Sequence, residues 1–142
     1  MSSNLLVAIF IHRLNLTTMK KIALLLLVIG VCAFQEITVD LRPGAFYKKL
    51  VENPDGVILD VRTKEEAANG RIPHAILLNY REDQFEEQIA QLDKSKTYFV
   101  YCGNGVRSDQ AIDIMERHGF KRYYNLIGGF KAWKADGLEV DR

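Results

Sequence analysis

The 142-residue chain is 48% hydrophobic and 26% charged, which is ordinary for a soluble globular protein and allows for one domain. Its formal net charge of +1 is too small for a nucleic-acid-binding protein, which needs a strongly basic face. Without its first 33 residues the chain keeps 16 basic and 18 acidic side chains, a net charge of −2, so we expect no nucleic-acid partner.

The N-terminal extension, residues 1–33, has the pattern of a secretory signal peptide. Lys20 and Lys21 precede an uncharged apolar stretch, residues 22–34, which is too short to span a bilayer. The basic pair directly after Met19 suggests that this methionine, and not Met1, is the true initiator. We therefore expect an exported, periplasmic protein whose folded domain covers residues 34–142.

The end of the apolar stretch predicts how the signal is processed. Val31 and Ala33 are small enough for the −3 and −1 positions of a cleavage site, so we expect cleavage after Ala33. An uncleaved membrane anchor and lipid attachment at Cys32 are the alternatives, and any membrane contact is expected through this segment alone. Cleavage leaves Cys102 as the single thiol of the exported domain, which favours a reactive group over a disulfide.

Short apolar runs alternate with amphipathic segments along the rest of the chain. This pattern predicts an α/β fold in which helices cover both faces of a mainly parallel sheet. The strongest strand signal, rich in aromatic and β-branched residues, immediately precedes Cys102. The predicted strands are 37–39, 57–60, 75–78, 97–101 and 123–127, and the predicted helices are 43–51, 82–92, 108–118 and a short one after Gly128-Gly129.

The loop Cys102–Ser108 carries the features of an anion-binding nucleophile site. Its Gly103, Asn104 and Gly105 tolerate positive φ, so the backbone N–H groups can turn inward around an anion. The positive end of the next helix, expected near Ser108, and the cation of Arg107 point to the same place. Val106 completes the loop and is expected to bind the substrate with the other loop residues. The loop therefore predicts that the Cys102 thiol has a lowered pKa and acts as a nucleophile.

The loop resembles the six-residue active-site loop of the rhodanese family, Cys-x-x-Gly-x-Arg, and the likeness extends over about residues 36–136. Other segments are similar to family signatures, namely Asp60-Val61-Arg62, Gly70–Ala75, and Gly128-Gly129 with Trp133. Arg71 and His74 depart from the pattern, because histidine and glycine are usual there. The resemblance implies a rhodanese-like single domain with no cofactor.

The resemblance also implies a sulfurtransferase. Cys102 is then the catalytic residue and takes a sulfane sulfur from a small anionic donor such as thiosulfate or a persulfide. The resulting persulfide passes its sulfur to a thiol or cyanide. The loop N–H groups stabilise the developing charge, Asp60 accepts hydrogen bonds from the loop, and Arg62 orients the loop, attracts the donor or pairs with Glu65 or Glu66.

Two other functions remain open from the residues alone. A cysteine phosphatase or arsenate reductase uses a similar loop, but with five residues between cysteine and arginine, whereas four separate Cys102 from Arg107. A non-catalytic sulfur carrier or interaction module is the second alternative. Because the chain has one exported cysteine and no clustered histidines, we expect no metal site. Arg107 is also expected to pair with a carboxylate beneath the loop.

Overall fold

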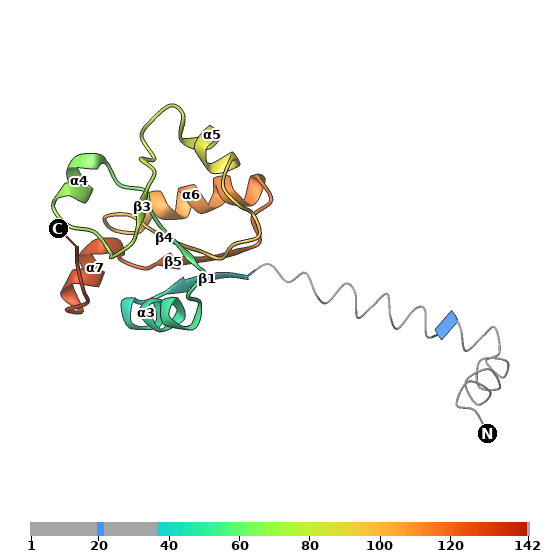
Figure 1. Cartoon of the computed structure of the whole chain (residues 1–142), viewed down its shortest axis with the longest axis horizontal. Coiled ribbons are helices and arrows are strands. Elements are labelled where there is room, and N and C mark those ends of the chain that lie inside the picture. Colours follow the sequence, from blue (N-terminus) through green and yellow to red (C-terminus); the bar gives the residue numbers. More distant parts are fainter. Residues whose placement is uncertain (1–19, 22–36, 142) are drawn as a thin grey trace, which may run out of the picture. The chain divides into compact units, whose positions relative to one another are not determined.

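The computed structural model describes Lys20, Lys21 and residues 37–141. In chain order, strands and helices alternate over the described domain (Figure 1). Most of the predicted signal segment, including Cys32, lies outside the described residues. The elements are β1 (Ile37–Leu41), α3 (Pro43–Glu52), β2 (Val57–Asp60), α4 (Lys64–Ala68), β3 (Ile76–Leu77), α5 (Phe85–Ala90), β4 (Tyr98–Tyr101), α6 (Val106–Arg117), β5 (Arg122–Leu126) and α7 (Gly129–Ala135).

The five described strands form one parallel sheet in the order β1-β5-β4-β2-β3. The central strand β4 has the sequence YFVY, and all four of its side chains are buried. A parallel strand with both faces covered reads as a continuous apolar run, so the composition of β4 matches its place. Cys102 follows this central strand directly, at the carboxyl edge of the sheet.

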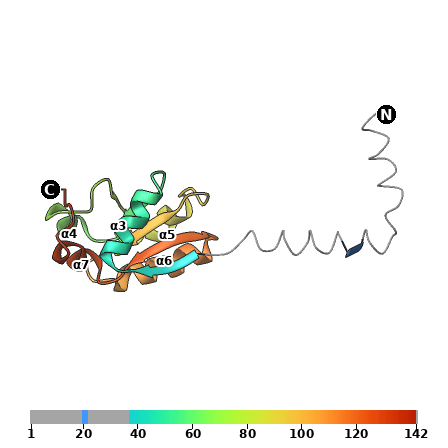
Figure 2. The same ribbon diagram turned by 90° about the horizontal axis from the view of Figure 1, so that it is seen from below.

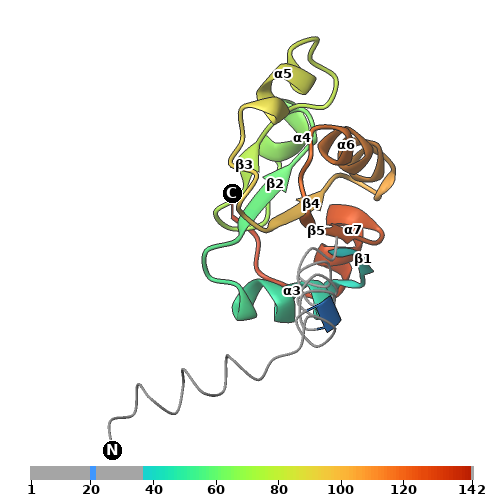
Figure 3. The same cartoon turned by 90° about the vertical axis from the view of Figure 1, so that its right-hand side faces the viewer.

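Side chains alternate between two apolar cores, one on each face of the sheet. Val100 of β4 points into the core formed with α5 and α6, and its neighbour Phe99 points into the core formed with α3 and α7. Figure 3 shows α3 and α6 on opposite sides of the strands. The predicted α/β class, with a parallel sheet covered on both faces, is therefore confirmed.

Several predicted boundaries differ from the structure. Strand β3 has two residues and not four, and α5 is shorter than the predicted helix 82–92. The helix after the cysteine loop begins at Val106 and not near Ser108, because the left-handed Gly105 (φ 104°) ends the turn and serves as its N-cap. Val51, near the end of α3, is 65% exposed.

Helix α4 is the one described helix that the sequence pattern does not predict. Its five residues are too few to show a helical period. Its start is nevertheless marked by a capping box, in which Thr63 accepts from the Glu66 N–H and the Glu66 carboxylate accepts from the Thr63 N–H. Figures 1 and 2 both show α4 and α7 at the same end of the sheet.

The two departures from the family signature lie on the surface. Arg71 and His74 are both exposed. His74 has φ 62°, a left-handed conformation that glycine adopts more easily, which explains why glycine is usual at this position. Among the described residues, no helix has the length and apolar character needed to cross a membrane.

Candidate active site

The cysteine loop is a turn of four residues between β4 and α6. It runs from Cys102 to Gly105, and α6 starts at the next residue. Of the three residues expected to tolerate positive φ, Gly105 is the one that adopts it. Arg107 and Ser108 consequently lie in the first turn of α6, which places both beside the cysteine.

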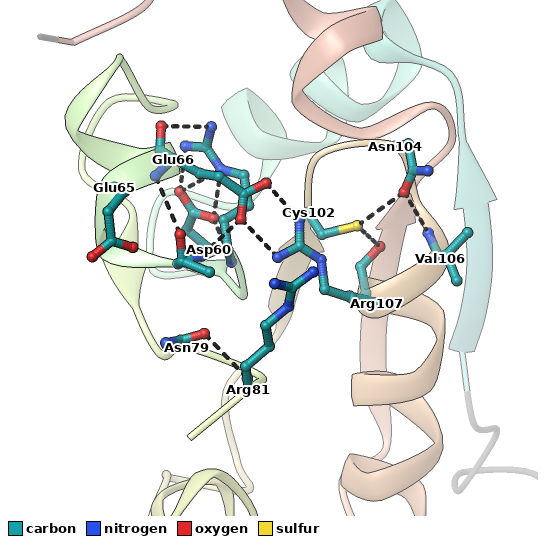
Figure 4. A network of polar contacts seen from close by, with 12 residues as sticks. Asp60, Glu65, Glu66, Asn79, Arg81, Cys102, Asn104, Val106 and Arg107 are labelled. Carbon is teal, nitrogen blue, oxygen red and sulfur yellow. Dashed lines mark hydrogen bonds and ion pairs between the residues drawn. The ribbon is translucent and has the colours of Figure 1, made fainter. Parts of the chain in front are cut away.

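The Cys102 sulfur is buried among polar groups of this turn (Figure 4). It accepts the Gly105 N–H at 3.1 Å, and the Ser108 hydroxyl oxygen lies 3.7 Å away. The protonated thiol donates to the side-chain oxygen of Asn104 at 3.8 Å. That oxygen also accepts the Val106 N–H at 3.3 Å, so the Asn104 side chain is folded back over the turn.

Two opposing effects set the acidity of the thiol. Burial raises the pKa of Cys102, because a thiolate loses hydration there. The backbone N–H groups of Ser108, Asn104 and Gly105, together with the Ser108 hydroxyl, favour the thiolate and outweigh burial. The pKa of Cys102 is therefore lowered, in the direction that increases its nucleophilicity at neutral pH.

Arg107 is held by a carboxylate from α4. Its two terminal nitrogens donate to the two oxygens of Glu66, each at 2.7 Å (Figure 4). The hydrogen bonds from Arg107 lower the pKa of Glu66 to about 2 despite partial burial. The expected pairing of Arg107 with a carboxylate is confirmed. The ion pair also joins the cysteine loop to α4, and it leaves the guanidinium charge largely balanced.

The structure contradicts the predicted contacts of Asp60 and Arg62. Asp60 makes no hydrogen bond to the loop; its carboxylate accepts from Arg62, with the shortest contact at 2.6 Å, and from the Tyr101 hydroxyl at 2.7 Å. Arg62 is 3% exposed, so it does not form a surface ion pair. Its hydrogen bonds go to Asp60 and to the carbonyls of Glu66 and Gly70, the last at 2.9 Å, and not to the loop. The two side chains form a buried network beneath the sheet edge.

The beginning of α7 supports the loop from its other side. The Phe130 N–H donates to the Cys102 carbonyl at 2.7 Å, and the Lys131 N–H donates to the Gly103 carbonyl at 3.1 Å. A Cβ on Gly129 would lie 2.4 Å from the Cys102 carbonyl oxygen, so only glycine allows this close approach. The prediction treated Gly129 only as part of a signature and did not place Glu66 in the site, although its capping-box spacing was visible.

His118 follows the last residue of α6, and its ring contacts Glu86 at 3.0 Å. The side chains of Phe130 and Trp133 lie in the core between the sheet, α3 and α7. In the described part of the chain, no group of three histidine, cysteine, aspartate or glutamate side chains is close enough to hold a metal ion.

The sequence also matches a family model, that of the rhodanese-like domain, over residues 43–136. The chain belongs to the rhodanese-like domain family. The fold agrees, since a rhodanese-like domain protein from Staphylococcus aureus superposes with a TM-score of 0.62. That structure is 33% identical, and the match covers 73% of this chain and 99% of the other.

Curated rhodanese relatives cover most of the same domain. The thiosulfate sulfurtransferase GlpE of Coxiella burnetii is 37% identical over 87 residues, which is 61% of this chain and 79% of the relative. A sulfurtransferase of Allochromatium vinosum is 32% identical over 93 residues, which is 66% of this chain and 85% of the relative. These relatives support a sulfurtransferase function for the rhodanese domain described above.

Proposed function

We propose that the protein is a thiosulfate sulfurtransferase that works through a persulfide on Cys102. The observation that carries this proposal is a buried thiol of lowered pKa in a short turn whose backbone N–H groups point at the sulfur. The relatives named as sulfurtransferases support the same reaction class.

The reaction has two steps, each of which transfers one sulfur atom. The Cys102 thiolate attacks the outer sulfur of thiosulfate, the S–S bond of the donor breaks, and sulfite leaves with the bonding electrons. A thiol or cyanide then attacks the outer sulfur of the Cys102 persulfide, and Cys102 leaves as a thiolate. Because one substrate departs before the next reacts, we expect ping-pong kinetics.

The turn around Cys102 has the groups that both steps need. The N–H groups that favour the thiolate also favour the negative charge of the persulfide and of each transition state. The sulfur is covered in this structure, so the donor must displace a neighbouring group. Asn104 is the exposed residue in contact with the sulfur, and we expect its side chain to swing aside.

The Arg107–Glu66 pair favours this reaction over phosphate chemistry. A phosphatase arginine uses its planar fork of donors to hold two oxygens of the tetrahedral anion. Here both terminal nitrogens of Arg107 are already bonded to the Glu66 carboxylate. The short spacing between Cys102 and Arg107 supports the same conclusion. A non-catalytic sulfur carrier remains the second candidate, and turnover distinguishes it from an enzyme.

Replacing the nucleophile tests the proposal. We expect Cys102→Ser to abolish thiocyanate production from thiosulfate and cyanide, because a hydroxyl cannot form the persulfide. Mass spectrometry after incubation with thiosulfate should show a gain of one sulfur atom in the wild type and none in the variant. Ser95→Ala is the control, because Ser95 is exposed and bonds to Asp93, and this variant should retain full activity.

Three other results would contradict the proposal. Full turnover by Cys102→Ser would remove Cys102 from the reaction. A persulfide that forms in the wild type without any thiocyanate production would make the protein a carrier. Hydrolysis of a small aryl phosphate without turnover of thiosulfate would indicate a phosphatase.

A further inference from the structure

A hollow of about 290 Å³ adjoins the cysteine loop on the side of α4 and α7. Its lining includes the buried guanidinium of Arg62 and the Phe130 ring, which lie 4.1 Å apart from guanidinium carbon to ring centroid. Gly103 of the cysteine loop and Asn69, at the end of α4, also line it. The hollow therefore begins one residue away from Cys102.

The unbalanced charge of this hollow is positive. Lys131 and Lys134 of α7 line it, are exposed, and form no ion pair with any described residue. The Lys134 ammonium lies 5.2 Å from the Phe130 ring centroid, so it is held over the aromatic wall. Glu66 also lines the hollow, but its carboxylate is bonded to Arg107.

The Arg62 guanidinium does not add a free charge, because Asp60 balances it. Their contact is 2.6 Å, and both side chains are almost fully buried. Arg62 also donates to the carbonyls of Gly70 and Glu66. Arg62 is thus already bonded to its partners, and the exposed side chains of Lys131 and Lys134 are the cationic groups available to an anion.

Backbone hydrogen bonding fixes the distance between the hollow and the nucleophile. Lys131 is held beside the loop because its N–H donates to the Gly103 carbonyl at 3.1 Å. Gly103 lies between Cys102 and the hollow, and a Cβ there would stand 3.3 Å from a terminal nitrogen of Arg107 and 3.5 Å from a carboxylate oxygen of Glu66. The Arg107–Glu66 ion pair therefore lies over this glycine, and a substrate longer than thiosulfate has to pass beside the pair to reach from the hollow to Cys102.

We propose that this hollow binds the carboxylate end of an organic thiol acceptor while its sulfur reacts with the Cys102 persulfide. The proposal rests on the proposed sulfur transfer and names the class of acceptor. In that step the acceptor thiolate forms a bond to the outer sulfur, and the bond from that sulfur to Cys102 breaks. The acceptor leaves as a persulfide, and Cys102 is again a thiolate.

The test compares glutathione with its diethyl ester, which has the same thiol but no carboxylates. In Lys131→Gln/Lys134→Gln we expect the KM for glutathione to rise about threefold to tenfold, as for the loss of two exposed charge contacts. The KM for the ester and for thiosulfate, and kcat with saturating acceptor, should stay as in the wild type. Added salt should raise the wild-type KM for glutathione and not that for the ester.

A matched control removes the same charge elsewhere. Lys94 and Lys96 are exposed and precede β4, whereas Cys102 follows it, so Lys94→Gln/Lys96→Gln removes two positive charges at the opposite edge of the sheet. This control should leave the KM for glutathione unchanged. The proposal would be overturned if the KM for glutathione were unchanged in Lys131→Gln/Lys134→Gln, or if the KM for the ester rose equally in that variant. An equal rise of the KM for glutathione in Lys94→Gln/Lys96→Gln would overturn it as well.

A binding measurement separates this inference from the proposed activity. S-methylglutathione cannot accept sulfur, so its binding does not depend on turnover. Titrating it into the wild type should shift the amide NMR signals of Gly103, Asn69 and Lys131. In Lys131→Gln/Lys134→Gln the dissociation constant should rise by the same factor as the KM for glutathione. Shifts confined to other residues, or none, would overturn the site even if thiosulfate turnover is normal.

Discussion

The Cys102 thiol is acidic because its hydrogen-bond partners favour the charged form more than burial disfavours it. The Arg107 cation was expected to contribute to this acidity, but Glu66 balances it through two hydrogen bonds. The groups that lower the pKa of Cys102 are N–H groups of the turn and the Ser108 hydroxyl. The acid limb of the kcat/KM profile follows the pKa of Cys102, so we expect it to move when one of these contacts is removed.

Ser108→Ala removes one hydroxyl near the sulfur and keeps the Ser108 backbone N–H. Because the hydroxyl favours the thiolate, its loss should raise the Cys102 pKa. The acid limb of the kcat/KM profile should move to higher pH, while activity at high pH, where the thiol is fully ionised, should be unchanged. Ultraviolet absorbance of the thiolate gives the same pKa without turnover. A shift to lower pH, or one shared by Ser95→Ala, would contradict this assignment.

The active site depends on how three short elements meet at the carboxyl edge of the sheet. Helix α6 begins at Val106, the first turn of α7 packs on the loop backbone, and α4 supplies Glu66. The Glu66–Arg107 pair connects α4 with α6, and the capping box fixes Glu66 on its own helix. We infer that Glu66 is a positioning residue, since it acts on the loop through Arg107.

Glu66→Gln tests this connection, and the exposed Glu65→Gln on the same helix is its control. The glutamine amide has one oxygen that accepts, so one of the two hydrogen bonds from Arg107 should be lost. The cysteine loop should then be held less firmly, and kcat should fall roughly tenfold. The freed Arg107 charge should also lower the thiol pKa, which moves the acid limb to lower pH. A fall in kcat without that movement would indicate a purely structural role.

The same variant gives a stability prediction with a defined sign. The folded pKa of Glu66 is about 2, below the ordinary value of 4.5. Its contribution to the free energy of unfolding is therefore complete above about pH 4.5 and is lost as the pH falls toward 2. The difference in unfolding free energy between wild type and Glu66→Gln should shrink over this range, as urea denaturation can measure. A difference that stays constant would contradict the shifted pKa.

The whole domain is held by two separate cores on either face of one parallel sheet. The core beneath α3 and α7 is rich in aromatic contacts, since Phe46 meets Phe99 at 5.4 Å and Trp133 at 6.2 Å between ring centroids. Both contacts are edge-on, the arrangement that aromatic rings favour. This core also carries α7, whose first turn supports the cysteine loop.

Phe46→Ala should lower the free energy of unfolding by about 3–5 kcal/mol, because it opens a cavity at a fully buried position. Val51→Ala on the same helix should change it by less than about 0.5 kcal/mol, since Val51 is 65% exposed. Urea denaturation of the wild type and of both variants measures these changes, when the three curves are fitted with one common dependence of the unfolding free energy on urea concentration. Equal losses for the two variants would contradict the assignment of the core.

The sequence by itself determined the alternation of strands and helices, the parallel sheet and the place of Cys102 after its central strand. These features follow from local patterns, because an apolar run such as Tyr98–Tyr101 and a glycine at the start of α6 have structural consequences within a few residues. The predicted signal over residues 1–33, apart from Lys20 and Lys21, lies outside the described residues and stays a prediction.

The tertiary structure alone decided which charged groups meet. Glu66 and Arg107 are 41 residues apart, as are Asp60 and Tyr101, and no local pattern relates such partners. Their pairing depends on parallel strands placing their carboxyl ends at one edge, and on side-chain directions that only packing sets. For this reason the predicted hydrogen bonds between Asp60 and the loop were wrong, since Asp60 bonds to Arg62 and Tyr101. The pairing of Glu66 and the position of the lysines beside the hollow were found only in the folded domain.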